Sequence, residues 1–93
     1  MPIASFRCPD TQAFFETGSN RRFTNIRSAL SRKLGLLDEA TSLDDLRALP
    51  GNRLEALAGN RKGQHSIRVN DQFRLCFVWT PDGPKDVACV DYH

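Results

Sequence analysis

The spacing of the apolar residues changes near residue 52, and this change most strongly limits the folds open to the chain. Upstream, apolar side chains recur every three or four residues, which predicts a helix over residues 21–38 with one buried stripe. That stripe consists of Phe23, Ile26, Leu30, Leu34 and Leu37. Downstream, apolar and polar residues approximately alternate, as in strands that bury one face. The sequence therefore predicts an α+β fold, with helices packed on an antiparallel sheet.

Turn and capping residues place the remaining elements. Asp10 and Gly18 are expected to bound a short helix over residues 11–17, and Ser42 to begin a helical turn over residues 43–48. Strands are predicted at residues 2–7, 53–58, 64–69, 72–79 and 85–92. The fourth of these is the most apolar, so it is expected to be the central strand.

The length and composition fit one small globular protein. With 93 residues, of which 40% are hydrophobic, the chain is expected to form a single domain over residues 1–93. No apolar run approaches the ~20 residues of a membrane span, and the first residues lack the apolar core of a signal peptide. We therefore expect a cytoplasmic protein that does not contact a membrane.

The three cysteines, Cys8, Cys76 and Cys89, are far apart and form no CxxC pair. Cys76 and Cys89 lie in apolar segments, which favours buried free thiols over a disulfide or a redox site. A zinc site would have to assemble from these and two scattered histidines, so neither a metal nor a cofactor is expected. His65 alternates with the apolar Ile67 and is interpreted as a packed histidine.

Positive charge is concentrated in one part of the chain. Residues 53–80 contain five cations against two carboxylates, and most cations of the whole chain are arginines. The five are Arg53, Arg61, Lys62, Arg68 and Arg74. Because arginine binds phosphate through two parallel hydrogen bonds, a polyanionic partner is one interpretation. The other is an ordinary solvated surface.

Two features of the second half could serve chemistry. Alternation in the 72–79 strand places Arg74 on the face opposite its most apolar side chains. An unpaired arginine is costly to bury, so Arg74 is expected either to form a salt bridge with a strand neighbour or to bind a phosphate. The last residues, Asp91, Tyr92 and His93, carry three groups that commonly transfer protons. From spacing alone they could equally be an incidental polar tail.

A specific pattern runs through residues 57–77. It reads G-N-R-x-G-x-x-S-I-R-x-N-x-x-F-R from Gly59 to Arg74, and the chain closes on the tripeptide DYH at residues 91–93. With these motifs the sequence resembles the HigB branch of the RelE-type toxins. Residues 3–7 and 23–37 are similar as well, so the resemblance covers essentially the whole chain.

The resemblance implies a RelE-like fold and a toxin of a type II toxin–antitoxin module that cleaves mRNA in the ribosomal A site. A ribose 2′-OH would attack the adjacent phosphate without a metal, leaving a 2′,3′-cyclic phosphate and a 5′-OH. Arg74 would clamp the phosphate, Tyr92 and His93 would transfer protons or stack on a base, and Asp91 would orient them. RNA backbone contacts would come from Arg53, Arg61, Lys62 and Arg68.

The resemblance also implies the partners. These would be the ribosome with its mRNA and a HigA-like helix-turn-helix antitoxin. Operator DNA would be bound through the antitoxin, because no helix-turn-helix with a basic recognition helix is apparent in this sequence.

The sequence departs from some relatives at Glu55 and Ala58, where those toxins carry a histidine and a lysine. The general base is therefore left open, because Glu55 can accept a proton but cannot stabilise a phosphorane. The terminal carboxylate on His93 favours the imidazolium form, which suits a general acid. The rival interpretation is a non-catalytic RNA- or ribosome-binding module on the same fold.

Overall fold

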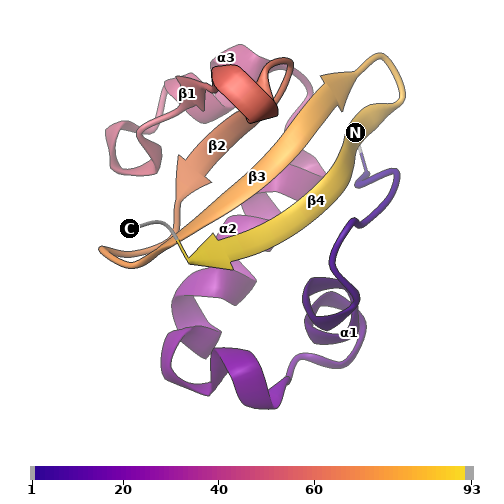
Figure 1. Cartoon of the computed structure of the whole chain (residues 1–93), viewed down its shortest axis with the longest axis vertical. Helices are drawn as coiled ribbons and strands as arrows, with labels where there is room; N and C mark the ends of the chain where they lie inside the picture. Colours follow the sequence, from indigo (N-terminus) through magenta and orange to yellow (C-terminus); the bar gives the residue numbers. More distant parts are fainter. Residues whose placement is uncertain (1, 92–93) are drawn as a thin grey trace.

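Helices cover one face of a four-stranded sheet in the computed structural model, which describes residues 2–91 (Figure 1). The elements in chain order are α1 (Pro9–Thr17), η1 (Arg21–Ile26), α2 (Arg27–Glu39), α3 (Leu43–Arg47), η2 (Pro50–Asn52), β1 (Glu55–Ala56), η3 (Gly59–Arg61), β2 (His65–Arg68), β3 (Phe73–Thr80) and β4 (Gly83–Asp91). The η elements are 3-10 helices. This arrangement confirms the α+β class. None of the helices within residues 2–91 is long and apolar enough to cross a membrane.

The sheet has the strand order β1-β2-β3-β4, and each neighbouring pair is antiparallel. The apolar strand β3 lies between β2 and β4, as expected for the central strand. Asn70 organises the β2–β3 turn, because its side-chain oxygen accepts hydrogen bonds from the backbone N–H groups of Gln72 and Phe73.

The hydrophobic core lies between α2 and the sheet. All five residues of the expected stripe are buried, and they pack with Ile67, Leu75 and Phe77 of the central strands. Each such side chain contributes about 1.5–3 kcal/mol when fully removed from water. His65 extends this layer, since its ring stacks on Phe77 with centroids 6.3 Å apart. The interpretation of His65 as a packed histidine is confirmed.

The expected helix over residues 21–38 is divided into η1 and α2. Phe23 departs from helical geometry, with φ −112° and ψ 19°. Asn20 caps the segment by accepting a hydrogen bond from the Arg22 N–H at 2.9 Å. Phe23 packs edge-to-face against Phe14 and Phe73, with centroids 6.0 and 6.2 Å apart. These aromatic contacts hold Phe23 where a regular α-helix would not place it.

Helix α1 begins two residues earlier than expected, at Pro9, and Cys8 rather than Asp10 is its N-cap. Proline suits the first helical position, because its missing N–H would have no partner there. The predicted end is confirmed, since Gly18 adopts φ 80° and its N–H bonds the Phe14 carbonyl at 2.7 Å.

Residues 2–7 do not form the expected strand. They run beside β4 in parallel, but the regular pairing is limited to an isolated bridge between Phe6 and Val87. The cause is Asp86, which adopts a left-handed φ of 54° and donates its N–H to the Ser5 hydroxyl. The same residue lies in a bulge of the β3–β4 ladder, where the register shifts between Cys76 and Val78.

The expected strand over residues 53–58 shortens to Glu55–Ala56. Arg53 has a left-handed φ of 45°, and the chain turns into η3 after Ala58. Both conformations are incompatible with an extended strand, so β1 is a short edge strand.

Candidate nucleic-acid interface

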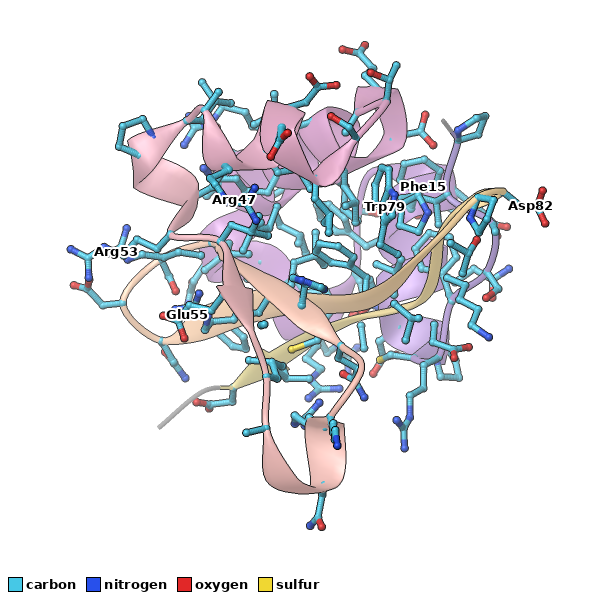
Figure 2. All side chains as sticks on the ribbon, turned by 90° about the horizontal axis from the view of Figure 1, so that it is seen from above. Phe15, Arg47, Arg53, Glu55, Trp79 and Asp82 are labelled. Carbon is cyan, nitrogen blue, oxygen red and sulfur yellow. The ribbon has the colours of Figure 1, made fainter. Side chains whose placement is uncertain are left out.

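One face of the sheet is turned away from α2, and we call it the open face. The pairings of Ser66 with Glu55 and with Cys76, and of Arg74 with Val90, place these side chains on it. Figure 2 shows Glu55 close to Arg53, where the chain enters β1.

Arg74 is held firmly on the open face. Its side chain is 11% exposed, and its Nε donates a hydrogen bond to the Ser66 hydroxyl at 2.9 Å. One terminal nitrogen donates to the Arg53 carbonyl at 2.7 Å, and the other lies 3.5 Å from a Glu55 carboxylate oxygen. The expected salt bridge is therefore present, but its partner Glu55 lies on β1, two strands from Arg74, rather than on a neighbouring strand. Because Glu55 is half-exposed, the pair is weakly stabilising, and the hydrogen bonds to neutral oxygens fix the guanidinium.

A groove of about 520 Å³ lies next to Arg74 on the open face. Ala88 and Val90 of β4 contribute to it, and Val90 is the register partner of Arg74. Arg7 and Arg61 contribute cationic side chains from segments far apart in the sequence. The remaining lining residues are Cys8, Asn60 and Gln64. A cationic groove with two amide side chains suits a phosphate-bearing ligand.

The four residues expected to contact RNA are dispersed around this face. Arg61 lines the groove, where its guanidinium lies 3.5 Å from the Gln64 side-chain oxygen. Lys62 follows it at the exposed turn. Arg53 is exposed beside Arg74, to which it gives its carbonyl. Arg68 pairs with Arg74 in the β2–β3 register, and its guanidinium forms an ion pair with the exposed Asp71.

The structure separates Asp91 from Arg74. Asp91 is opposite Phe73, one residue beyond the Arg74–Val90 pair, so alternation turns it toward the other face of the sheet. Its carboxylate accepts a hydrogen bond from the Gln72 amide at 2.9 Å. The other two expected catalytic residues, Tyr92 and His93, lie outside the described residues.

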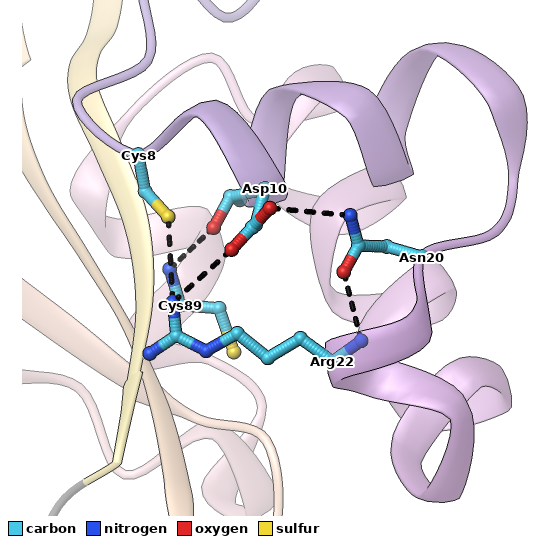
Figure 3. Close-up of polar contacts among 6 residues, drawn as sticks. Cys8, Asp10, Asn20, Arg22 and Cys89 are labelled. Carbon is cyan, nitrogen blue, oxygen red and sulfur yellow. Dashed lines mark hydrogen bonds and ion pairs between the residues drawn. The ribbon is translucent and has the colours of Figure 1, made fainter.

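A polar cluster at the start of α1 adjoins the groove (Figure 3). Arg22 extends toward Cys8 and Asp10, with its nitrogen 3.9 Å from the Cys8 sulfur and 3.5 Å from an Asp10 oxygen. Burial raises the pKa of the Cys8 thiol, but hydrogen bonds from Thr11 and the Asp10 N–H, with the Arg22 charge, bring it below its ordinary value.

The other two cysteines lie in the sheet. Burial raises the pKa of Cys89 to about 12. Cys76 and Cys89 are thus buried free thiols, as expected.

Sequence reasoning missed Arg7 as a site residue. Arg7 reaches the groove because the N–H and carbonyl groups of residues 4–7 bond to β4, including Arg7 N–H to Val87 carbonyl at 3.0 Å. The signal available in the sequence was a cation in a segment expected to join the sheet. Among residues 2–91, no three His, Cys, Asp or Glu side chains gather in a way that could hold a metal ion.

Two solved structures share this fold. One chain of the YoeB-YefM complex from Staphylococcus aureus matches with a TM-score of 0.60 at 21% identity, over 100% of this chain and 99% of that one. The YoeB/ParE toxin from Agrobacterium tumefaciens matches with a TM-score of 0.59 at 15% identity, over 100% of both chains. At these identities the likeness concerns the fold alone.

The sequence comparisons define the family. Residues 4–93 match the family described as the RelE-like toxin of the type II toxin-antitoxin system HigB. Toxin HigB-1 of Vibrio cholerae serotype O1 is 50% identical over 84 residues, which are 88% of this chain and 87% of that protein. The chain therefore belongs to the HigB family of RelE-like type II toxins.

Proposed function

We propose that this toxin is a ribosome-dependent endoribonuclease that cleaves mRNA in the A site and so stops translation. The observation that carries the proposal is Arg74, a nearly buried guanidinium fixed on the open face beside a groove lined by two further arginines. A cation in a fixed position can stabilise negative charge as it develops on a phosphate, without reorganising during the reaction.

The reaction would be an attack by a ribose 2′-OH on its own 3′-phosphate. The oxygen–phosphorus bond that forms gives a 2′,3′-cyclic phosphate, and the bond that breaks releases a 5′-OH. Arg74 would bind the non-bridging oxygens of the phosphorane. Glu55, with a carboxylate oxygen 3.5 Å from the Arg74 guanidinium, is a candidate acceptor for the 2′-OH proton.

The leaving 5′-oxygen requires a proton, and His93 is our candidate general acid, with Tyr92 as a second proton-transfer or stacking group. Asp91 would orient them. Its position on the other face of the sheet from Arg74 supports an indirect role rather than contact with the phosphate.

Binding of the ribosome and mRNA would use the cations around the groove. Arg61 and Arg7 line it, and Lys62, Arg53 and Arg68 lie along the same region of the sheet. Phosphate contacts fix the position and orientation of a nucleic acid without reading its sequence. The ribosome would supply the alignment of the 2′-OH, the phosphate and the leaving oxygen.

The partner that restrains the toxin would be a HigA-like helix-turn-helix antitoxin, through which the complex would also bind operator DNA. Membership of a toxin–antitoxin family supports this partnership. The similar chain from Staphylococcus aureus belongs to a YoeB-YefM complex. We propose that the toxin acts in the cytoplasm, where ribosomes and mRNA are found.

The proposal is tested by incubating the purified toxin with ribosomes that carry a defined mRNA. Cleavage at the A site, with a 2′,3′-cyclic phosphate on one fragment and a 5′-OH on the other, is expected. Intact mRNA on ribosomes that nevertheless stop translating would contradict the nuclease proposal. That result would favour inhibition by occupancy, because binding creates no new RNA ends.

A further inference from the structure

A second groove, of about 160 Å³, lies between the end of α2 and α3, and we call it the α2–α3 groove. It is lined by Leu36, Glu39, Ala40, Asp45, Leu46 and Leu49. Leu49 is 43% exposed and Phe15 is 38% exposed, the two large exposed hydrophobic residues within residues 2–91. A cavity of about 150 Å³ holds a benzene-sized group, so this groove has room for one large apolar side chain.

Acidic side chains surround the apolar floor of the α2–α3 groove. Residues 36–49 contain four carboxylates, those of Asp38, Glu39, Asp44 and Asp45, and a single cation, Arg47. Arg47 forms an ion pair with Asp44. Glu39 and Asp45 line the groove itself. Hydrogen bonds from the hydroxyl and the N–H of Thr41 lower the pKa of Asp45, which keeps this carboxylate ionised.

This charge distribution excludes two occupants. RNA would be repelled by the carboxylates, so the α2–α3 groove is not an extension of the cationic open face. A symmetric contact with a second copy would place the acidic groove against itself. A head-to-tail contact would require an exposed apolar side chain with basic neighbours. Phe15 does not meet that requirement, because α1 contains Asp10 and Glu16 and no lysine or arginine.

We propose that the α2–α3 groove is the docking site of the antitoxin, which inserts a large apolar side chain beside Leu49 and pairs lysine or arginine with Glu39 and Asp45. The occupant would be a basic amphipathic segment, a common ligand of apolar grooves. This proposal rests on the proposed antitoxin partner. It has a structural consequence, because the α2–α3 groove shares no lining residue with the groove beside Arg74. An antitoxin segment bound in the α2–α3 groove would therefore leave the groove beside Arg74 unfilled.

Affinity measurements between purified toxin and antitoxin test this proposal. The antitoxin would be expressed from the open reading frame next to the toxin gene. Leu49→Lys and Glu39→Lys are the test variants, and both residues are exposed. A lysine at Glu39 also suits the C-terminal end of α2. Asp82→Lys makes the same charge change as Glu39→Lys, and Asp82 is an exposed turn residue across the molecule from Arg53 in Figure 2.

Each test variant is expected to weaken antitoxin binding at least about 30-fold, as loss of a central interface residue does, while Asp82→Lys binds like the unaltered protein. Thermal unfolding and growth arrest without antitoxin should stay unchanged in all three variants. Unchanged antitoxin affinity in Leu49→Lys and Glu39→Lys would overturn the proposal. Sedimentation of the toxin alone measures its self-association. If the two test variants lost self-association and kept their antitoxin affinity, the proposal would also be overturned, because the α2–α3 groove would then bind a second copy of the toxin.

Failure of the docking-site proposal can be distinguished from failure of the proposed nuclease function. The binding assay contains no RNA, so an absence of mRNA cleavage by the unaltered toxin would refute the nuclease alone. Failure of the unaltered toxin to bind the antitoxin would overturn both the docking site and the partnership.

Discussion

The Nε of Arg74 donates a hydrogen bond to the Ser66 hydroxyl at 2.9 Å, across the pair of central strands. Ser66 is fully buried, so its hydroxyl holds the Nε end of the guanidinium in a fixed position. The terminal nitrogens contact the Arg53 carbonyl and the Glu55 carboxylate. Two adjacent strands therefore determine where the proposed phosphate clamp lies.

Arg74→Ala is expected to reduce mRNA cleavage on ribosomes by roughly 100-fold or more, because it removes the group proposed to stabilise the phosphorane. Ribosome affinity should be largely kept. Arg74→Lys retains the charge but loses the fork geometry, so an intermediate rate is expected. Single-turnover cleavage on saturating ribosomes measures both, after thermal unfolding has shown that each variant is folded. Full activity in a folded Arg74→Ala protein would remove Arg74 from the mechanism.

Arg61→Ala, Lys62→Ala and Arg7→Ala are expected to weaken ribosome binding without a comparable loss of cleavage at saturation. Each removes a cation near the groove, so the slope of log affinity against log salt should become shallower by roughly one for each phosphate that the variant no longer binds. Binding titrations at several salt concentrations provide the measurement. Lys85→Ala, an exposed cation on β4 outside the groove, is the matched control. Equal effects in the control would mean that overall charge, rather than the groove, governs binding.

Deletion of His93 is expected to lower cleavage by roughly 100-fold, because the leaving oxygen loses its proposed proton donor. Asp91→Asn should have a smaller effect, since Asp91 lies on the other face of the sheet from Arg74 and bonds Gln72. The comparison uses cleavage rates on ribosomes with ribosome affinity as the control. A larger loss from Asp91→Asn than from deletion of His93 would reverse the proposed roles.

Asn52→Ala is expected to lower the free energy of unfolding by about 3 kcal/mol. The buried Asn52 side chain accepts a hydrogen bond from the Lys33 ammonium and donates one to the Leu46 carbonyl at 3.1 Å. Removing it leaves a buried charge without its acceptor. The double variant Lys33→Met with Asn52→Leu should recover much of the loss, because it removes both polar partners. Urea denaturation of the unaltered protein, the single variant and the double variant measures these free energies of unfolding.

The stability of the protein is expected to fall as the pH drops below about 6.5, the ordinary pKa of histidine in an unfolded chain. Burial, with the nearby Arg47 charge, lowers the pKa of His65 in the folded state. Its Nδ1 is buried and has no hydrogen-bond partner within residues 2–91. The unfolded chain therefore binds the proton more readily, so acid favours unfolding. His65→Gln should reduce this pH dependence in thermal unfolding at pH 7 and pH 5; an unchanged dependence would assign it to other groups.

Local patterns in the sequence predicted the core and the central strand. The stripe from Phe23 to Leu37 and the alternation of residues 72–79 each depend on neighbours a few positions apart, and burial rewards both patterns directly. Arg74 could be placed on the polar face of its strand for the same reason. The local geometry of Phe23 could not be predicted, because contacts with Phe14 and Phe73 impose it.

The groove beside Arg74 was less accessible to sequence reasoning, because it is made by distant segments. Arg7 and Arg61 line the same groove although more than half the chain separates them. The position of Asp91 depends on the pairing of β3 with β4, and an alternating sequence does not specify that pairing.

The irregularity at Asp86 determines which residues of β4 lie on the open face of the sheet. Continuing the pairing of Thr80 with Gly83 and of Val78 with Lys85 would bring Cys89 opposite Arg74, whereas the extra residue brings Val90 there. A regular ladder with the present number of residues would therefore point the buried Cys89 outward and Val90 inward. Lys85 and Asp86 are exposed, and their side chains are open to substitution. The extra residue and the bulge therefore belong together, because a regular β4 one residue shorter would keep Val90 opposite Arg74, whereas a regular β4 of the present length would not.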